Sequence, residues 1–341
     1  MVNIGLLLIL VMVLSLPFLV KKIEEELEIF LFFMGCAAVT ITTQWGGGLL
    51  REAIIVPINL TVAVLIAGFI FRILQRPIAG HVNKVIHKIG LKAFVFIVIA
   101  GLGLLSSIIT AIIASLVLVE VVHSLNIERE IKVKVVILTC FSIGLGAALT
   151  AIGEPLGTIT IAKLKGLPYQ AGFYFLVEHL GWYIIPGIVF FGLLGALLSP
   201  SRLKKQESLF GVKQESVKDI FTRTAKVYLF VMALVFLGCG FKPVIDTFIS
   251  KIPYRGLYWM NTISSVLDNA TLASAEIGPS LHILQIKAAL LGLLISGGML
   301  IPGNIPNIIA AGKLKIKSSE WAKFGIPSGL VTMVVYYFLL K

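Results

Sequence analysis

The sequence predicts an all-α polytopic membrane protein built from two inverted-topology repeats, each with a re-entrant helical hairpin and a discontinuous transmembrane helix. Three observations lead to this prediction. First, 58% of the residues are hydrophobic and only 13% are charged, whereas soluble domains carry about 25% charged residues. Second, Lys and Arg gather in alternate loops. Third, two interrupted apolar segments resemble each other in sequence.

The interrupted segments are residues 146–158 and 297–307. A shift of 150 positions aligns Gly153 with Gly303 and superimposes the Lys-Leu-Lys triplets that follow each segment. Each segment places glycine, proline and a polar or acidic side chain inside an apolar stretch. A broken helix survives in hydrocarbon only where it is buried in protein or lines a wet cavity. A matched pair of such breaks indicates the substrate site of a transporter.

Apolar stretches of about 20 residues are long enough to span a bilayer as a helix. This length criterion predicts eight spans, at residues 2–20, 28–44, 53–71, 133–162, 173–198, 226–248, 285–312 and 324–340. Two further apolar stretches, 93–122 and 257–281, are too long for one span and too short for two. Both have a polar middle, so we expect each to form a re-entrant hairpin.

The distribution of basic residues supports this topology. With eight spans and two hairpins, the expected cytoplasmic loops hold 21 Lys and Arg, and the opposite face holds 7. Such a bias is typical of cytoplasmic loops. These loops are 21–27, 72–92, 123–134, 199–226 and 313–323. The first hairpin then enters from the cytoplasm and the second from outside.

The topology divides the chain into four parts. Residues 1–50 hold two N-terminal helices, which are candidates for scaffold or homodimer contacts. The first repeat covers 51–198, with hairpin 93–122 and broken helix 133–162; a basic cytoplasmic loop covers 199–225; and the second repeat covers 226–341, with hairpin 257–281 and broken helix 285–312. The hairpins also resemble each other, because a shift of 158 positions aligns Ser106-Ser107 with Ser264-Ser265.

Acidic and amide side chains in these breaks and hairpins are the candidate ion ligands. Glu154 lies in the first break, and an ionisable group at membrane depth indicates a functional site. Asp268 and Asn269, with Thr271 close by, lie in the middle of the second hairpin and offer oxygen ligands to a cation. Glu276 lies two helical turns beyond Asn269, so both can face one side, and it is a candidate second carboxylate for a proton or cation.

Other polar residues have two interpretations. Asn304 and Asn307 flank the second break and either bridge to backbone or bind an ion. Three threonines are expected to bond local backbone, with a role in the site left open; they are Thr150, Thr158 and Thr160. Glu120 is expected at a solvated helix end.

Several function classes lack their sequence signals. The chain has no nucleophile elbow, zinc-protease motif or phosphate-binding loop, so we expect neither an enzyme nor an ATPase. No basic stripe interleaved with aromatic residues indicates nucleic acid. The three cysteines lie in apolar spans without metal or disulfide spacing. No cofactor is expected apart from a bound sodium ion.

The motifs resemble a known group. Thr150-Ala-Ile-Gly153-Glu154-Pro155 resembles the Gly-Asp-Pro break of the arsenite-permease and sodium/proton antiporter branch of the ion transporter superfamily. Leu267-Asp268-Asn269 resembles the hairpin of the same group, and the chain is most similar to a small prokaryotic family of proposed cation transporters. The resemblance covers about residues 53–340 and implies a site at the four tips, with ligands at Thr110, Glu154, Asp268, Asn269 and Asn304. The first hairpin departs from the group, because Thr110-Ala111 stands where relatives often carry a polar Asn pair.

These observations together favour a secondary transporter in the prokaryotic cell membrane. The expected activity is cation (sodium)/proton antiport by alternating access, with a small inorganic ion as substrate and the lipid bilayer as surroundings. The alternative is a sodium- or proton-coupled transporter of an anion, arsenite or a small carboxylate. The absence of Arg and Lys from both breaks and both hairpin tips weakens this alternative. A passive channel or a membrane scaffold is a further alternative.

Overall fold

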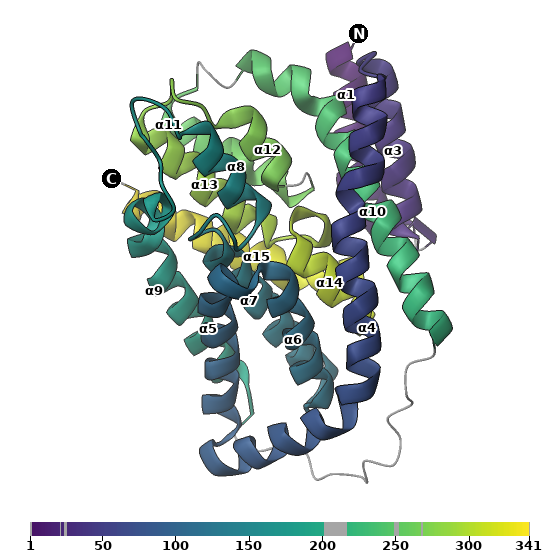
Figure 1. The fold of residues 1–341 in the computed structure, drawn as a ribbon, viewed down its shortest axis with the longest axis vertical. Coiled ribbons are helices and arrows are strands. Elements are labelled where there is room, and N and C mark those ends of the chain that lie inside the picture. Colours follow the sequence, from purple (N-terminus) through teal and green to yellow (C-terminus); the bar gives the residue numbers. More distant parts are fainter. Residues whose placement is uncertain are drawn as a thin grey trace.

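The protein is all-helical. The computed structural model describes residues 2–20, 22–23, 26–200, 217–248, 252–266 and 269–340, and these residues form helices and turns without a strand (Figure 1). Helices long and apolar enough to cross a membrane are α5 Leu91–Ile109, α9 Phe175–Leu198, α15 Ser318–Leu339 and residues Ile220–Lys242 within α10. The outer faces of α9 and α15 expose Trp182 and Phe338 by 86% and 72%, as lipid-facing helices do. The predicted class of helical membrane protein is confirmed.

Four helices pack along one side of the molecule (Figure 1). They are α1 Val2–Leu19, α3 Leu27–Ile41, α4 Gly47–Ile89 and α10 Val217–Phe248. Small residues allow α3 and α10 to approach closely, because a Cβ added at Gly35 would lie 2.8 Å from Cβ of Phe236, and one added at Gly240 would lie 2.6 Å from Cβ of Ala38. Small residues at such contacts are characteristic of helix packing in membranes.

Two of the predicted loops are partly helical. Residues 72–92 were expected as a loop, but α4 continues to Ile89 and ends where Gly90 adopts a φ of 83°. Likewise, α10 begins at Val217 inside the expected loop 199–225, and residues 201–216 of that loop lie outside the described part. Apolar length finds the part of a helix that lies in lipid. It does not find where the helix ends, because backbone hydrogen bonds continue without apolar side chains.

The first half of the chain continues through two pairs of helices. Residues 93–122 form α5 and α6 Ala111–Ser124, which meet at Thr110. Thr110 has a φ of 76°, and its Oγ1 accepts a 3.4 Å hydrogen bond from the amide of Ile113. The next pair is α7 Arg129–Ala147 and α8 Pro155–Lys163, and α9 completes this half.

The second half also consists of helices, with two 3-10 turns among them. The stretch after α10 contains α11 Tyr254–Met260, the 3-10 turn η2 Asn261–Ser265 and α12 Asn269–Glu276. The side chain of Gln285 donates a 3.3 Å hydrogen bond to the carbonyl of Ile252, so the start of this stretch lies beside the helix that follows it. The chain then forms α13 Ile283–Gly297, the 3-10 turn η3 Ile301–Gly303, α14 Ile305–Leu314 and finally α15.

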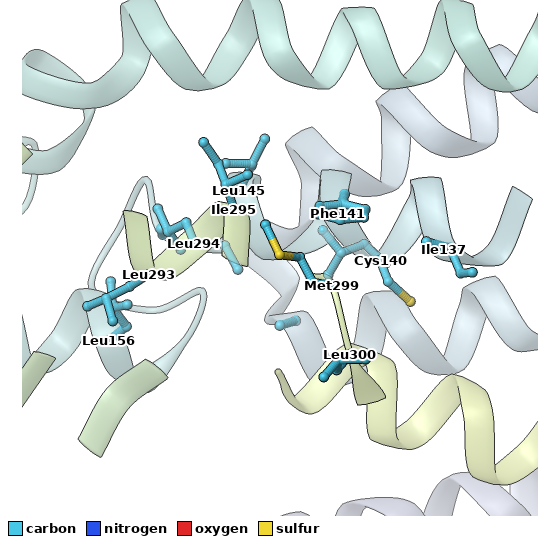
Figure 2. Close-up of a cluster of buried hydrophobic side chains, with 14 of the residues drawn as sticks. Ile137, Cys140, Phe141, Leu145, Leu156, Leu293, Leu294, Ile295, Met299 and Leu300 are labelled. Atoms are coloured by element: carbon cyan, nitrogen blue, oxygen red, sulfur yellow. The ribbon is translucent and has the colours of Figure 1, made fainter. Parts of the chain in front are cut away.

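The two halves join through α7 and α13. Figure 2 shows apolar side chains of both helices in one buried cluster that includes Phe141, Leu145 and Ile295. A Cβ at Gly298 would overlap the ring of Phe141, so glycine permits this close contact. The centre of the molecule is therefore the place where the two halves meet.

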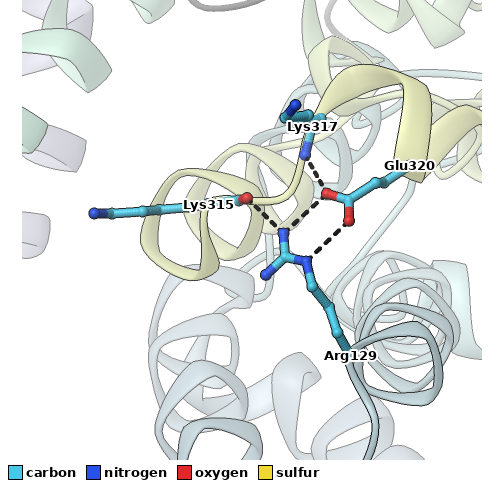
Figure 3. Close-up of polar contacts among 4 residues, drawn as sticks. All are labelled: Arg129, Lys315, Lys317 and Glu320. Carbon is cyan, nitrogen blue, oxygen red and sulfur yellow. Dashed lines mark hydrogen bonds and ion pairs between the residues drawn. The ribbon is translucent and has the colours of Figure 1, made fainter. Parts of the chain in front are cut away.

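An ion pair at the periphery links the same two halves (Figure 3). Arg129 donates from Nε and Nη2 to the two carboxylate oxygens of Glu320, each at 2.9 Å, and Nη2 also donates to the carbonyl of Lys315 at 2.8 Å. The hydrogen bond to Glu320 holds the pKa of the Arg129 guanidinium above its ordinary value. The predicted cytoplasmic loops 123–134 and 313–323 are thereby in contact.

Candidate functional site

Two interruptions of the helices lie at matching places in the two halves. Glu154 directly precedes α8 with φ −155° and ψ 161°, and Asn304 directly precedes α14 with φ −153° and ψ 147°. A proline lies in the first turn of both helices, where its missing amide hydrogen costs nothing. Both side chains are buried, with 7% of Glu154 and 5% of Asn304 exposed. The shift of 150 positions therefore aligns two residues with the same local structure.

The first interruption is attached to the junction of α5 and α6. The amide of Ala111 donates to the carbonyl of Gly153 at 2.8 Å. The hydroxyl of Thr150 donates to the carbonyl of Ser107 at 2.5 Å and accepts from the amides of Ile152 and Gly153 at 3.2 and 3.3 Å. Polar groups freed by the break are thus satisfied within the protein, as a break at membrane depth requires.

The second interruption is closed by Asn307. Its Nδ2 donates to the carbonyls of Gly297 and Leu300, both at 2.8 Å, and the side chain is fully buried. Asn269, the first residue of α12, lies against the same turn, because a Cβ at Gly297 would lie 2.6 Å from Nδ2 of Asn269. Asn307 therefore bridges backbone groups, which was one of its two predicted roles.

The two interruptions lie at one end of α7. A Cβ at Gly144 of α7 would lie 2.6 Å from Nδ2 of Asn304. Ala147 lies one helical turn after Gly144, at the end of α7. A Cβ at Gly153 would overlap the carbonyl of Ala147, and Glu154 directly follows Gly153. The elements around them pack in a reciprocal way, since α8 contacts α12 and α14 contacts α6.

This arrangement has a simple electrostatic character. The N-terminal ends of α8 and α14 carry the positive ends of the helix dipoles, and both lie inside the bundle. The polar groups set there are the carboxyl of Glu154 and the amides of Asn269 and Asn304. Such a set offers carboxylate and amide oxygens, the ligands that hard cations prefer. In the part of the chain that the structure describes, no group of three or more His, Cys, Asp or Glu side chains is placed to hold a metal.

Other predicted residues have different roles or lie outside the described part. Asp268 is not among the described residues, and the side chain of Thr271 is not described. The hydroxyl of Thr158 donates to the carbonyl of Ala151 at 2.5 Å, as predicted for a residue that bonds local backbone. Thr110 caps α6 with its own side chain.

Two predictions about polar residues were wrong. Glu120 was expected at a solvated helix end, but only 5% of it is exposed because α4, α5, α7 and α14 pack around α6. Thr160 was expected to bond local backbone, but its hydroxyl is buried without a hydrogen-bond partner among the described residues. Single-sequence patterns miss both, because burial of one helix face depends on which neighbours pack on it.

Sequence reasoning also missed Asn261. This fully buried residue donates from Nδ2 to Oε2 of Glu276 at 2.8 Å and to the carbonyl of Ala289 at 3.0 Å. Its carbonyl accepts from the hydroxyl of Ser296 at 2.5 Å. An amide inside the apolar hairpin 257–281 was the signal that could have found it. Glu276 contacts Asn261, which bonds the carbonyl of Ala289 on α13, whereas Asn269 lies against Gly297 at the end of α13.

The comparisons with known proteins place the chain in a family. The profile of DUF1646, described as a protein of unknown function, matches residues 3–341. The chain belongs to the DUF1646 family. No curated protein matches the chain. The match covers both interruptions and both halves, so the site described above lies within the DUF1646 region.

Truncation of Asn307 tests how the second interruption is closed. Asn307→Ala removes two donors and leaves the carbonyls of Gly297 and Leu300 buried and unpaired, which we expect to cost about 1–3 kcal/mol of stability. Thermal unfolding of the purified protein in detergent measures this. Gln44→Ala is the matched control, because Gln44 is an exposed amide in the turn before α4. Equal melting temperatures for the two variants would contradict the bridging role.

Proposed function

We propose that this DUF1646 protein is a secondary transporter of the prokaryotic cell membrane, a cation (sodium)/proton antiporter that works by alternating access. One observation carries the proposal. A buried carboxyl, Glu154, and a buried amide, Asn304, begin two equivalent half-helices whose N-termini lie inside the bundle. An ionisable group at membrane depth indicates a functional site, and a buried carboxyl is a group that can bind either a cation or a proton.

Contacts within the two halves support inverted repeats. In the first half, Gly103 of α5 lies against Ser142 and Gly146 of α7. The shift of 158 positions between the hairpins aligns Gly103 with Asn261. The shift of 150 positions between the broken helices aligns Ser142 and Gly146 with Gly292 and Ser296. Those three also touch, since Ser296 bonds the carbonyl of Asn261, and a Cβ at Gly292 would lie 3.1 Å from Cβ of Asn261. Each hairpin thus packs on its own broken helix through equivalent positions.

The mechanism follows from competition for the same oxygens. Burial disfavours the charged form of a carboxyl group, so Glu154 can hold either a proton or a cation. Asn269 and Asn304 add amide oxygens, and Asp268, the neighbour of Asn269 in the sequence, is the proposed second carboxylate. Movement of the hairpins and half-helices relative to the other helices would open the loaded site to each face of the membrane in turn.

An anion substrate is the second candidate, because half-helix N-termini bind anions. Glu154 directly precedes α8, so an anion that approached this helix end would meet an acidic residue. Like charges would repel there, so the cation proposal fits the site better.

A transport assay decides between these candidates. Purified protein in proteoliposomes with a pH-sensitive dye inside should move protons when sodium is added outside, and isotopic sodium should enter with matching kinetics. Proton movement driven by arsenite or a small carboxylate would favour the anion candidate. If sodium moved only down its own concentration gradient, even when a proton gradient was applied, the result would favour a channel.

The inverted topology has its own test. In a background without Cys36, Cys140 and Cys239, single cysteines at Asn126 and at His282 should react with an impermeant maleimide from opposite sides of the membrane. Both positions are exposed in turns after the two hairpins. Labelling of both from the same side would rule out the inverted repeat. Permeabilised membranes, in which both should react, provide the control for accessibility.

A further inference from the structure

Glu276 and Asn261 form a buried pair away from the two interruptions. Glu276 is 3% exposed and Asn261 is fully buried. Both hydrogens of the Asn261 amide are used, one on Oε2 of Glu276 at 2.8 Å and one on the carbonyl of Ala289 at 3.0 Å. Two acceptors of the pair, Oε1 of Glu276 and Oδ1 of Asn261, have no hydrogen-bond partner among the described residues.

One added hydrogen satisfies both acceptors. A neutral carboxylic acid is a donor as well as an acceptor, so a proton on Oε1 lets the acid donate to Oδ1 of the amide while Nδ2 donates to Oε2. Carboxyl and primary amide groups form such a two-bond pair in a plane. A hard cation is a poorer fit, because it takes about six or more oxygen ligands and this pair leaves two oxygens free.

We propose that Glu276 carries the proton that is exchanged in each transport cycle, held as a neutral acid against Asn261. This inference rests on the proposed antiport function and moves the exchanged proton from Glu154, which then serves as a cation ligand, to Glu276. When Glu276 releases the proton, Oε1 and Oδ1 are two acceptors without a donor, and the pair separates. Charge and atoms balance, because one proton leaves as one sodium ion binds at the interruptions.

The pair is connected to the second interruption through short contacts. The carbonyl of Asn261 accepts from Ser296 at 2.5 Å, and Ser296 precedes Gly297, whose carbonyl accepts from Asn307 at 2.8 Å. In addition, α12 has Glu276 at one end and Asn269 at the other, about 10 Å apart at 1.5 Å per residue. A change of the pair therefore acts directly on the helix that carries a candidate cation ligand.

The pair occurs in the second half alone. Under the shift of 158 positions its counterparts are Leu118 and Gly103, neither of which titrates. Three elements, α8, α10 and α13, pack against α12, and their ionisable side chains among the described ones are Lys163, Lys218, Lys226, Tyr228, Cys239, Lys242 and Lys287. Among the described residues, the polar group that contacts the Glu276 carboxyl is the Asn261 amide. Because the carboxyl–amide pair occurs once, we expect this site to release one proton in each transport cycle.

Infrared difference spectroscopy of the purified protein tests the proposal without transport. We expect a protonated-carboxyl band that shifts in heavy water, is lost in Glu276→Gln and weakens when sodium is added. Glutamine offers an N–H to Oδ1 of Asn261, so this variant should fold. Asn261→Leu should keep the band but shift it, because the acceptor of its hydrogen bond is gone. Glu130→Gln, which neutralises an exposed carboxylate of α7, should keep the wild-type spectrum.

Transport measurements complete the test. In proteoliposomes, Glu276→Gln should keep sodium/sodium exchange and lose sodium-driven proton movement. An unchanged band in Glu276→Gln, or a band that sodium does not alter in a protein that exchanges sodium for protons, would overturn the proposal. Absence of any sodium exchange in the wild type, with the Glu276 band present, would instead show that the proposed antiport function is wrong.

Discussion

Glu154→Gln is expected to abolish sodium-driven proton movement while the protein remains folded in the membrane. Glutamine keeps the size of the side chain but removes the charge that binds a cation. Loss of one carboxylate from a buried charged set costs on the order of 3–5 kcal/mol, which weakens sodium binding more than about 100-fold. Binding of isotopic sodium to purified protein and proton flux in proteoliposomes measure the two effects.

The control is a carboxylate with the same formal charge in a different place. Glu130 forms an exposed ion pair with Lys134 at 2.6 Å, so Glu130→Gln should bind and transport as the wild type does. The hairpin residue Asp268, replaced by Asn, should behave like Glu154→Gln. Normal transport with unchanged pH dependence in both Glu154→Gln and Asp268→Asn would refute cation antiport, and the anion candidate would become the better one.

Gly146→Ala is expected to lower the free energy of unfolding of the protein. A Cβ at this position would overlap the carbonyl of Gly103 on α5, and backbone cannot move aside as a flexible side chain does. Overpacking of a tight interior costs up to about 3 kcal/mol, and occasionally more. We expect this loss of stability to appear as a lower melting temperature in detergent and as a larger aggregated fraction in size-exclusion chromatography.

The matched control lies on the facing helix. Gly101 of α5 is two residues from Gly103, but a Cβ there meets nothing within 4 Å. Alanine favours a helix over glycine by about 1 kcal/mol, so Gly101→Ala should hold or raise the melting temperature. If Gly146→Ala proved as stable as Gly101→Ala, the close contact between α5 and α7 would not exist as described.

The helices that lie in lipid were predictable, and their extensions were not. The expected spans 2–20 and 173–198 differ from α1 and α9 by at most two residues at either end, because the thickness of hydrocarbon sets a minimum apolar length. By contrast, α4 runs 18 residues past its expected end at position 71. Outside lipid, a helix ends where its backbone meets a residue such as Gly90, and hydropathy contains no such signal.

The interruptions were predictable for a related reason. Proline and glycine with a polar neighbour conflict with an unbroken helix, and this conflict is visible in the sequence at Glu154 and Asn304. The pairing of Glu276 with Asn261 was not visible. The pairing depends on how the 3-10 turn η2 packs, because Asn261 in this turn contacts both Glu276 of α12 and Ala289 of α13.

The sequence by itself therefore determined the membrane class, the two interrupted segments and the residues that begin their second halves. These features depend on local chemistry, namely apolar length, missing backbone donors and the cost of a charge in hydrocarbon. Only the tertiary structure decided that Asn304 packs against Gly144, that Glu120 is buried, and that Asn261 donates a hydrogen bond to Glu276. Each of these depends on which helix faces meet, and many different packings satisfy the same apolar pattern.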